Sequence, residues 1–139
     1  MGLSFRDRAV CHLDLVQEAT DPVWSSLEKI NPQEADAVLR RDLTFLSRQL
    51  EDFPFRAVVC TSARVLEEVS TTARVQIKFT GKMARLTWYV GKIHLNRGSV
   101  GLAAWNIPLK RATGLKAKDE PELGGVLRRH LELLGTKLN

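Results

Sequence analysis

The sequence predicts an α/β protein: a three-layer sandwich with an open, mostly parallel or mixed central sheet and helices on both faces. Short runs that are continuously apolar or alternate in polarity are typical of strands. They are separated by segments whose apolar residues recur every three or four positions, which is typical of helices. The 139 residues contain no repeat, linker or low-complexity tract, so we expect a single domain over residues 1–139.

The N-terminal part contains one predicted strand and two predicted helices. Residues 9–16 (AVCHLDLV) have the composition of a strand, and Pro22 suits the first turn of a short helix over PVWSSLEKI. Asn31-Pro32-Gln33-Glu34 then forms a variant of the capping box, and the apolar residues behind it fall on one helical stripe until Pro54.

The next segment predicts a strand followed directly by a helix. The continuous apolar run FRAVVCTS (residues 55–62) indicates a central strand covered on both faces, and Ser62 is placed to cap a helix over ARVLEEV. A strand, a small polar turn and a helix at this spacing resemble half of a βαβ unit.

The rest of the chain predicts three more strands and a final helix. Alternating polarity favours strands over residues 73–79 and 86–95, with a turn at Gly81-Lys82 between them. A turn at residues 96–98 leads to the last strand, VGLAAW, and Pro121 opens a C-terminal helix that Gly135 ends.

The charge distribution favours an anionic partner. The formal net charge is +5, and the 41 residues from Lys78 to Lys118 hold nine cations and no acidic residue. Such a field attracts phosphate backbones and other anionic surfaces, so DNA is the expected partner and an acidic protein is the alternative. A basic surface that serves only solubility agrees with the same pattern.

Several classes of protein are not expected. No apolar run approaches the roughly 18 to 20 residues that span a bilayer, and the N-terminus lacks the apolar core of a signal peptide. We therefore expect a cytoplasmic protein without membrane contact, in which Cys11 and Cys60 are reduced, buried thiols. The three histidines show no ligand spacing, so neither a metal nor a cofactor is expected.

The stretch WNIPLKR (residues 105–111) is the first candidate site. Trp105 offers a flat face for stacking a base, and Asn106 offers donors and an acceptor for a base edge. Lys110 and Arg111 follow where a phosphate backbone could pass, and Lys92 and Arg97 are expected to contact phosphate as well. The alternative is that the indole fills the core and the amide satisfies its own turn.

Polar residues follow three of the predicted strands. Ligands of open α/β sheets collect beyond the carboxyl ends of strands, and these ends carry Asp14 with Gln17, Thr61 with Ser62, and Trp105 with Asn106.

Asp14 is the candidate carboxylate at these strand ends. It could stabilise a developing sugar cation, or it could instead form the following turn or pair with an arginine such as Arg8. His12 lies on the same face of a regular strand as Asp14 and would complete an acid–base pair, or it is a core histidine.

The order of these pieces resembles the later part of the uracil-DNA glycosylase superfamily. The resemblance rests on HLDLVQEATDPVW, RAVVCTSARVLEEV and WNIPLKRATGL and spans residues 10–134. It implies a uracil-DNA glycosylase-like fold and excision of a damaged or modified base that is flipped out of DNA. LDLV would be the base-reading strand, and WNIPL would hold the place of the minor-groove loop, where many members have His-Pro-Ser.

The resemblance leaves the reaction without an inherited water-activating residue. The family's first motif, a Gly-rich loop with an Asp-Pro-Tyr or Asn-Pro element, is absent, so Asp14 and Asn106 are the candidate catalytic residues. His12, Gln17, Thr61, Ser62 and Trp105 are the candidate substrate contacts. The alternatives are a non-catalytic module that grips nucleic acid or a protein with the same scaffold, and a regulatory subunit without nucleic acid.

Overall fold

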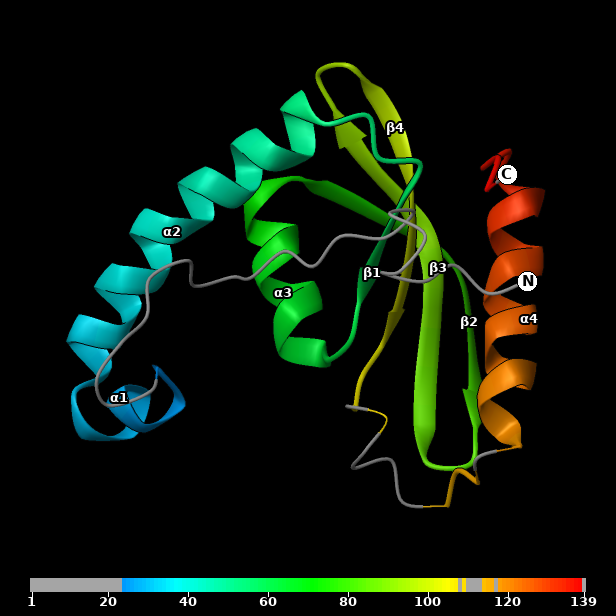
Figure 1. The fold of residues 1–139 in the computed structure, drawn as a ribbon, viewed down its shortest axis with the longest axis horizontal. Coiled ribbons are helices and arrows are strands. Elements are labelled where there is room, and N and C mark those ends of the chain that lie inside the picture. The colour runs from blue at the N-terminus through cyan, green and yellow to red at the C-terminus, as the bar shows by residue number, and fades with distance from the viewer. Residues whose placement is uncertain (1–23, 108, 110–113, 117, 139) are drawn as a thin grey trace. The chain divides into compact units, whose positions relative to one another are not determined.

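The computed structural model describes residues 24–107, 109, 114–116 and 118–138 (Figure 1). The chain divides into two compact units, residues 1–48 and residues 49–139, and each is described by itself. The single domain expected over residues 1–139 stays a prediction.

The described part of the first unit is helical. α1 (Trp24–Ile30) is followed by α2 (Pro32–Asp52), whose last residues belong to the second unit. The capping box is confirmed, because Asn31 Oδ1 accepts from the Glu34 backbone N–H at 3.3 Å and Asn31 Nδ2 donates to the Glu34 carboxylate at 3.1 Å. The predicted apolar stripe is also confirmed, since Val38 is half-buried and its other members are buried: Ala35, Leu39, Leu43, Leu46 and Leu50.

The second unit contains a four-stranded mixed sheet. Its strands are β1 (Ala57–Cys60), β2 (Arg74–Met83), β3 (Leu86–Leu95) and β4 (Gly98–Trp105), in the order β1-β4-β3-β2. β1 pairs with β4 in parallel, whereas β4 with β3 and β3 with β2 are antiparallel. α3 (Ala63–Thr72) connects β1 to β2, and α4 (Asp119–Leu133) follows β4.

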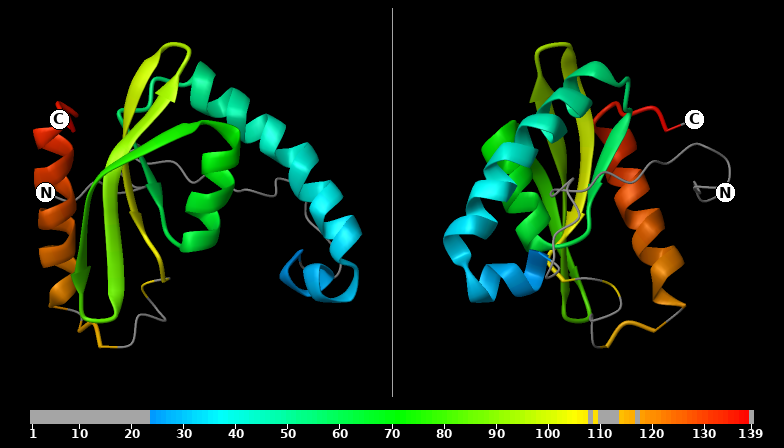
Figure 2. Two further views of the ribbon diagram at one scale, coloured as in Figure 1. Left: turned by 180° about the vertical axis from the view of Figure 1, so that it is seen from behind. Right: turned by 60° about the vertical axis from the view of Figure 1, so that its left-hand side comes forward.

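α3 and α4 lie on opposite faces of this sheet (Figures 1 and 2). The predicted α/β class, with a mixed open sheet and helices on both faces, is therefore confirmed. The finer expectation of a uracil-DNA glycosylase-like arrangement stays a prediction.

Among the described strands, the strand after Pro54 lies at the edge of the sheet and is not the central, doubly covered strand that the sequence predicted. β1 stands at one end of the order of the described strands, and Val59 is 53% exposed. β4 pairs with only one side of β1. A short apolar run does not reveal how many neighbours a strand has, and this explains the error.

The predicted turn at Gly81-Lys82 was also wrong, because β2 continues to Met83. Gly81 pairs with Trp88 in β3, and a Cβ at Gly81 would lie only 2.3 Å from the indole Cζ2 atom. This glycine therefore makes room for a large ring within the sheet and does not end the strand. The turn comes at residues 84–85, where Ala84 has a φ of 52°.

A β-bulge in β2 changes which of its residues face α4. The register shifts between Ile77 and Phe79, and Gly91 pairs with Ile77 just before the shift. A Cβ at Gly91 would lie 2.1 Å from the Gln76 carbonyl oxygen, so only glycine permits this close approach of the two backbones.

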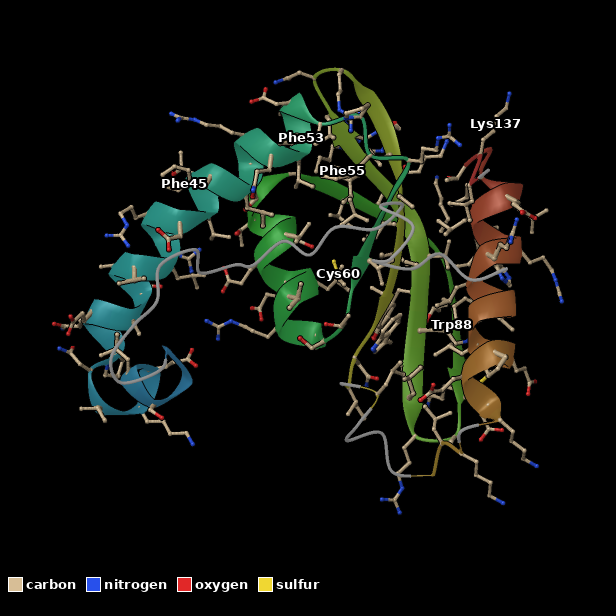
Figure 3. All side chains as sticks on the ribbon, viewed as in Figure 1. Phe45, Phe53, Phe55, Cys60, Trp88 and Lys137 are labelled. Atoms are coloured by element: carbon tan, nitrogen blue, oxygen red, sulfur yellow. The ribbon has the colours of Figure 1, made fainter. Side chains whose placement is uncertain are left out.

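The main core of this unit lies between the sheet and α4. His130 lies against the rings of Phe79 and Trp88, each 4.9 Å away between centroids, while its Nδ1 contacts the Val126 carbonyl at 2.8 Å. Figure 3 shows Trp88 between the sheet and α4. The buried members of this core come from β3, β4 and α4: Leu86, Trp88, Val90, Ala103, Trp105, Leu123, Leu127 and Leu131.

Candidate nucleic-acid interface

The carboxyl ends of β1 and β4 lie next to each other, as expected for neighbouring parallel strands. The backbone N–H of Ala63 donates to the Asn106 carbonyl at 3.1 Å, which joins the two ends directly. Thr61 and Ser62 are thus brought close to Trp105 and Asn106, so the sheet collects four of the predicted site residues at one edge.

Asn106 fastens the end of β4 to β3. Its backbone N–H donates to the Thr87 carbonyl at 3.1 Å, while its side-chain Oδ1 accepts from the Thr87 N–H at 2.8 Å. The side-chain carbonyl thus takes the ladder position that the backbone carbonyl leaves when it turns towards Ala63. The Oδ1 atom, which was expected to read or polarise a base, thus holds two strands together. This contact does not use the Nδ2 hydrogens, which can donate to a ligand.

Ser62 and Thr61 have different roles at the end of β1. Ser62 is the N-cap of α3, and its Oγ accepts from the Val65 N–H at 3.3 Å, which confirms the predicted cap. Thr61 is exposed beside it. Of the two hydroxyls expected to contact substrate, the hydroxyl of Thr61 is the more accessible.

Trp105 is buried in the core under α4, and this corrects the expectation of an open aromatic surface. Its side chain is 9% exposed and belongs to the same cluster as Leu127 and Leu131. Because side chains alternate along a strand, Trp105 shares the face of Ala103, which α4 covers. No described residue accepts a hydrogen bond from its buried Nε1 atom. The packing role weighed as the alternative is the one that the structure supports.

Arg97 is anchored to the C-terminal end of α2. Its Nε donates to the Leu50 carbonyl at 3.2 Å and its Nη2 to the Phe55 carbonyl at 3.4 Å. The positive charge of a guanidinium beside the last carbonyls of a helix is attracted to their partial negative charge, which stabilises the helix end. Arg97 thus makes a fold-stabilising contact, and its expected phosphate contact stays a prediction.

Arg97 is also remote from Asn106. Asn106 lies opposite Thr87 near the start of β3, whereas Arg97 follows Leu95 at its end. The eight residue steps from Thr87 to Leu95 extend over roughly 26 Å at about 3.3 Å per step. Arg97 and Asn106 therefore do not form one site along this strand.

Lys92 belongs to a group of polar side chains that spans three strands. Lys92 and His94 continue the row of β3 side chains that pack under α4. Gln76 and Arg74 of β2 pair with Lys92 and His94 respectively, and Ser99 of β4 pairs with His94 from the other side. We call these five residues the polar face: Arg74, Gln76, Lys92, His94 and Ser99.

Hydrogen bonds hold the centre of the polar face together. Ser99 Oγ lies 2.9 Å from His94 Nδ1, and Gln76 Oε1 lies 3.3 Å from His94 Nε2. Arg74, Gln76 and Ser99 are exposed, while Lys92 and His94 are half-buried. The polar face therefore offers two cations and several donors to solvent.

The sheet carries no negative charge that would oppose an anion. None of its four strands contains Asp or Glu. Arg74 and Lys92 are diagonal neighbours across β2 and β3, a separation of about 7–8 Å between such positions. Two cations at this distance can attract neighbouring phosphates of one backbone.

Five residues of the predicted site lie outside the described residues. They are His12, Asp14 and Gln17 near the N-terminus, and Lys110 and Arg111 after β4. Their expected roles in base excision and in phosphate binding stay predictions.

Four residues of the polar face were missed by the sequence interpretation, which included only Lys92. The signal was available for His94, two positions along the same strand, since alternate residues share a face. Arg74, Gln76 and Ser99 could be added only once the pairing of β2 and β4 with β3 was known.

The thiol of Cys60 is not part of a reactive site. Cys60 is a fully buried free cysteine, and burial raises its pKa to about 12, so it remains protonated at neutral pH. Figure 3 shows Cys60 on the α3 side of β1. Among the described residues, no group of three His, Cys, Asp or Glu is arranged to hold a metal ion.

Comparisons with protein-family models, curated proteins and solved structures found no match. Within the described ranges, no helix is both long and apolar enough to cross a membrane.

Proposed function

We propose that this protein binds nucleic acid, with DNA as the expected ligand, through the polar face. The observation that carries the proposal is the placement of Arg74 and Lys92 on one face of a sheet whose strands lack acidic residues. When cationic side chains bind a phosphate backbone, they displace its condensed counterions, and the release of these ions favours binding.

The uncharged members of the polar face support the same ligand. Both ring nitrogens of His94 are engaged within the polar face, but the Nε2 hydrogens of Gln76 can donate to phosphate or sugar oxygens, which receive half to two-thirds of the hydrogen bonds in protein–DNA complexes. Since such contacts carry no sequence information, we expect binding with little sequence preference. Aromatic stacking does not contribute on this face, because Trp88 and Trp105 are buried beneath α4.

The test is a titration of a labelled 20-base-pair duplex, and of each of its single strands, at several salt concentrations. Lys92→Gln should weaken binding to all sequences by a similar factor. It should also reduce the slope of log K against log salt by about one. Arg74→Gln should do the same.

Arg129→Gln is the matched control for this experiment. Arg129 is exposed on α4 between the buried Leu127 and Leu131, so its loss changes the net charge equally without altering the polar face. An equal loss of affinity in this variant would mean that net charge alone attracts DNA. Binding to a poly-glutamate peptide with equal affinity and the same response to Lys92→Gln would instead favour an acidic protein as the partner.

We also propose base excision as a second activity, supported by the meeting of the β1 and β4 ends. Thr61 is exposed beside Asn106, whose Nδ2 hydrogens are not used by its contact with Thr87. The test is to incubate the protein with uracil-containing oligonucleotides and to cleave any abasic sites with alkali. Strand breaks that disappear in Asp14→Asn would support the proposal, whereas breaks that persist unchanged would remove Asp14 from the reaction.

A further inference from the structure

Three side chains from three adjacent strands form a continuous chain of hydrogen bonds on the polar face. Ser99 of β4 and His94 of β3 are directly paired, and the Ser99 Oγ to His94 Nδ1 distance is 2.9 Å. On the other side of the ring, His94 Nε2 lies 3.3 Å from Oε1 of Gln76 in β2. The imidazole is therefore held at both nitrogens.

The chemistry of these partners determines the direction of the hydrogen bonds. An amide oxygen only accepts, so its contact with His94 Nε2 places the hydrogen of the neutral ring on that nitrogen. Nδ1 is then unprotonated and accepts from the Ser99 hydroxyl. A hydroxyl that donates to an imidazole, which a third group orients in turn, is the arrangement that activates a serine nucleophile.

The surroundings of Ser99 allow a substrate to approach and indicate its charge. Ser99 and Gln76 are exposed, and His94 is half-buried. Arg74 of β2 pairs with His94 of β3, and Lys92 lies two residues before His94 on the same face of the sheet. Lys92 is a diagonal neighbour of Ser99, and Arg74 lies on the far side of His94 from it. The two cations favour an acyl group that carries a negative charge, and Lys92 can stabilise a developing oxyanion.

We propose that Ser99 is a nucleophile toward activated carboxylic esters with an anionic acyl group, with His94 as its base and Gln76 as the residue that positions His94. Ser99 Oγ attacks the ester carbonyl carbon while its proton passes to His94 Nδ1. The bond to the leaving alkoxide or phenoxide then breaks, and His94 returns the proton to the leaving oxygen or to solvent. Water, activated by His94 in the same way, hydrolyses the acyl-serine to the carboxylate and restores the hydroxyl.

The test uses the 4-nitrophenyl monoester of succinic acid, with 4-nitrophenyl acetate as the uncharged comparison. The protein is mixed with each ester at pH 7.5, quenched in acid, and acylation is measured at each serine by peptide mass spectrometry. Ser70 is the internal control, because its exposed hydroxyl donates to the Leu66 carbonyl at 2.7 Å and not to an imidazole. Ser99 should be acylated at least about tenfold faster than Ser70. This rate enhancement is smaller than the roughly 100-fold or more that general bases typically contribute, because this site is open to water.

Variants separate the three roles. His94→Gln should reduce acylation of Ser99 to the level of Ser70. Gln76→Leu should reduce it in part, and Gln76→Glu should raise it several-fold, because a carboxylate stabilises the imidazolium that forms. Arg74→Gln should reduce the preference for the succinate ester over the acetate ester.

Two results would overturn the proposal. One is acylation of Ser99 no faster than that of Ser70 in a protein whose unfolding midpoint is unchanged. The other is an unaltered rate at Ser99 in His94→Gln. A rate in Gln76→Glu equal to or below that in Gln76→Leu would remove the positioning role of Gln76. None of these results depends on whether DNA is bound, so this proposal and the proposed function fail separately.

Discussion

The hydrogen bond from the Thr87 N–H to Asn106 Oδ1 predicts that the protein loses stability when this oxygen is removed. Asn106→Leu keeps a side chain of similar size but removes the Oδ1 atom that accepts from the Thr87 N–H at 2.8 Å. The backbone bonds of Asn106 to Thr87 and Ala63 do not use the side chain and should remain. The Thr87 N–H then loses its acceptor at the end of the sheet.

The expected cost follows from this loss. A typical intramolecular hydrogen bond contributes about 0.5–1.5 kcal/mol, and leaving a buried donor unpaired costs about 1–3 kcal/mol. Asn106 is half-buried, so water reaches the N–H in part, and we expect a loss of about 2 kcal/mol in the free energy of unfolding. With a urea m-value of about 2 kcal/mol/M, the unfolding midpoint should fall by about 1 M.

Urea denaturation of the full chain, followed by circular dichroism, measures this shift, and hydrogen exchange of the Thr87 amide locates it. Asn106→Asp is the matched control, because a carboxylate oxygen can accept the same bond and the midpoint should stay within about 0.3 M of wild type. A Leu variant as stable as wild type, or an Asp variant as unstable as the Leu variant, would refute the assigned role of Oδ1.

The remaining predictions concern the sheet, an exposed position of α4, the hairpin turn and the thiol of Cys60. Gly91→Ala should destabilise the protein by about 3 kcal/mol in urea denaturation, because the new methyl would meet the Gln76 carbonyl. Gly124→Ala, with open space at an exposed helical position, should instead stabilise it by about 1 kcal/mol. Ala84→Val should lower the melting temperature and Ala84→Gly should not, since a φ of 52° suits glycine and strains a β-branched residue. In a Cys11→Ala background, Cys60 should react with a thiol reagent at pH 8 only on unfolding, and a fast reaction of the folded protein would contradict its burial. Because its pKa is raised from 9.0 to about 12, the stability that the neutral thiol contributes should be lost as the pH rises from about 9 towards 12.

Local patterns in the sequence determined most of the elements. The three- and four-residue steps of α2 and α4, the capping box at Asn31 and the N-cap at Ser62 were read correctly, because each depends on residues within one or two helical turns. Alternation also found β3 and the first part of β2, and the turn at residues 96–98 preceded the apolar run that forms β4. The net charge and its acid-free run are properties of the sequence itself and needed no structure.

The tertiary structure alone decided the neighbours of each strand and the faces that helices cover. Among the described strands, β1 lies at the edge of the sheet because β4 pairs with one side of it. Trp105 is a core residue because α4 packs over the face of the sheet on which this ring lies. Gln76, His94 and Ser99 come together through the pairing of three strands, although the first lies 18 positions before the second. Strand pairing is a long-range choice made by the packing of the whole sheet, so no local pattern encodes it.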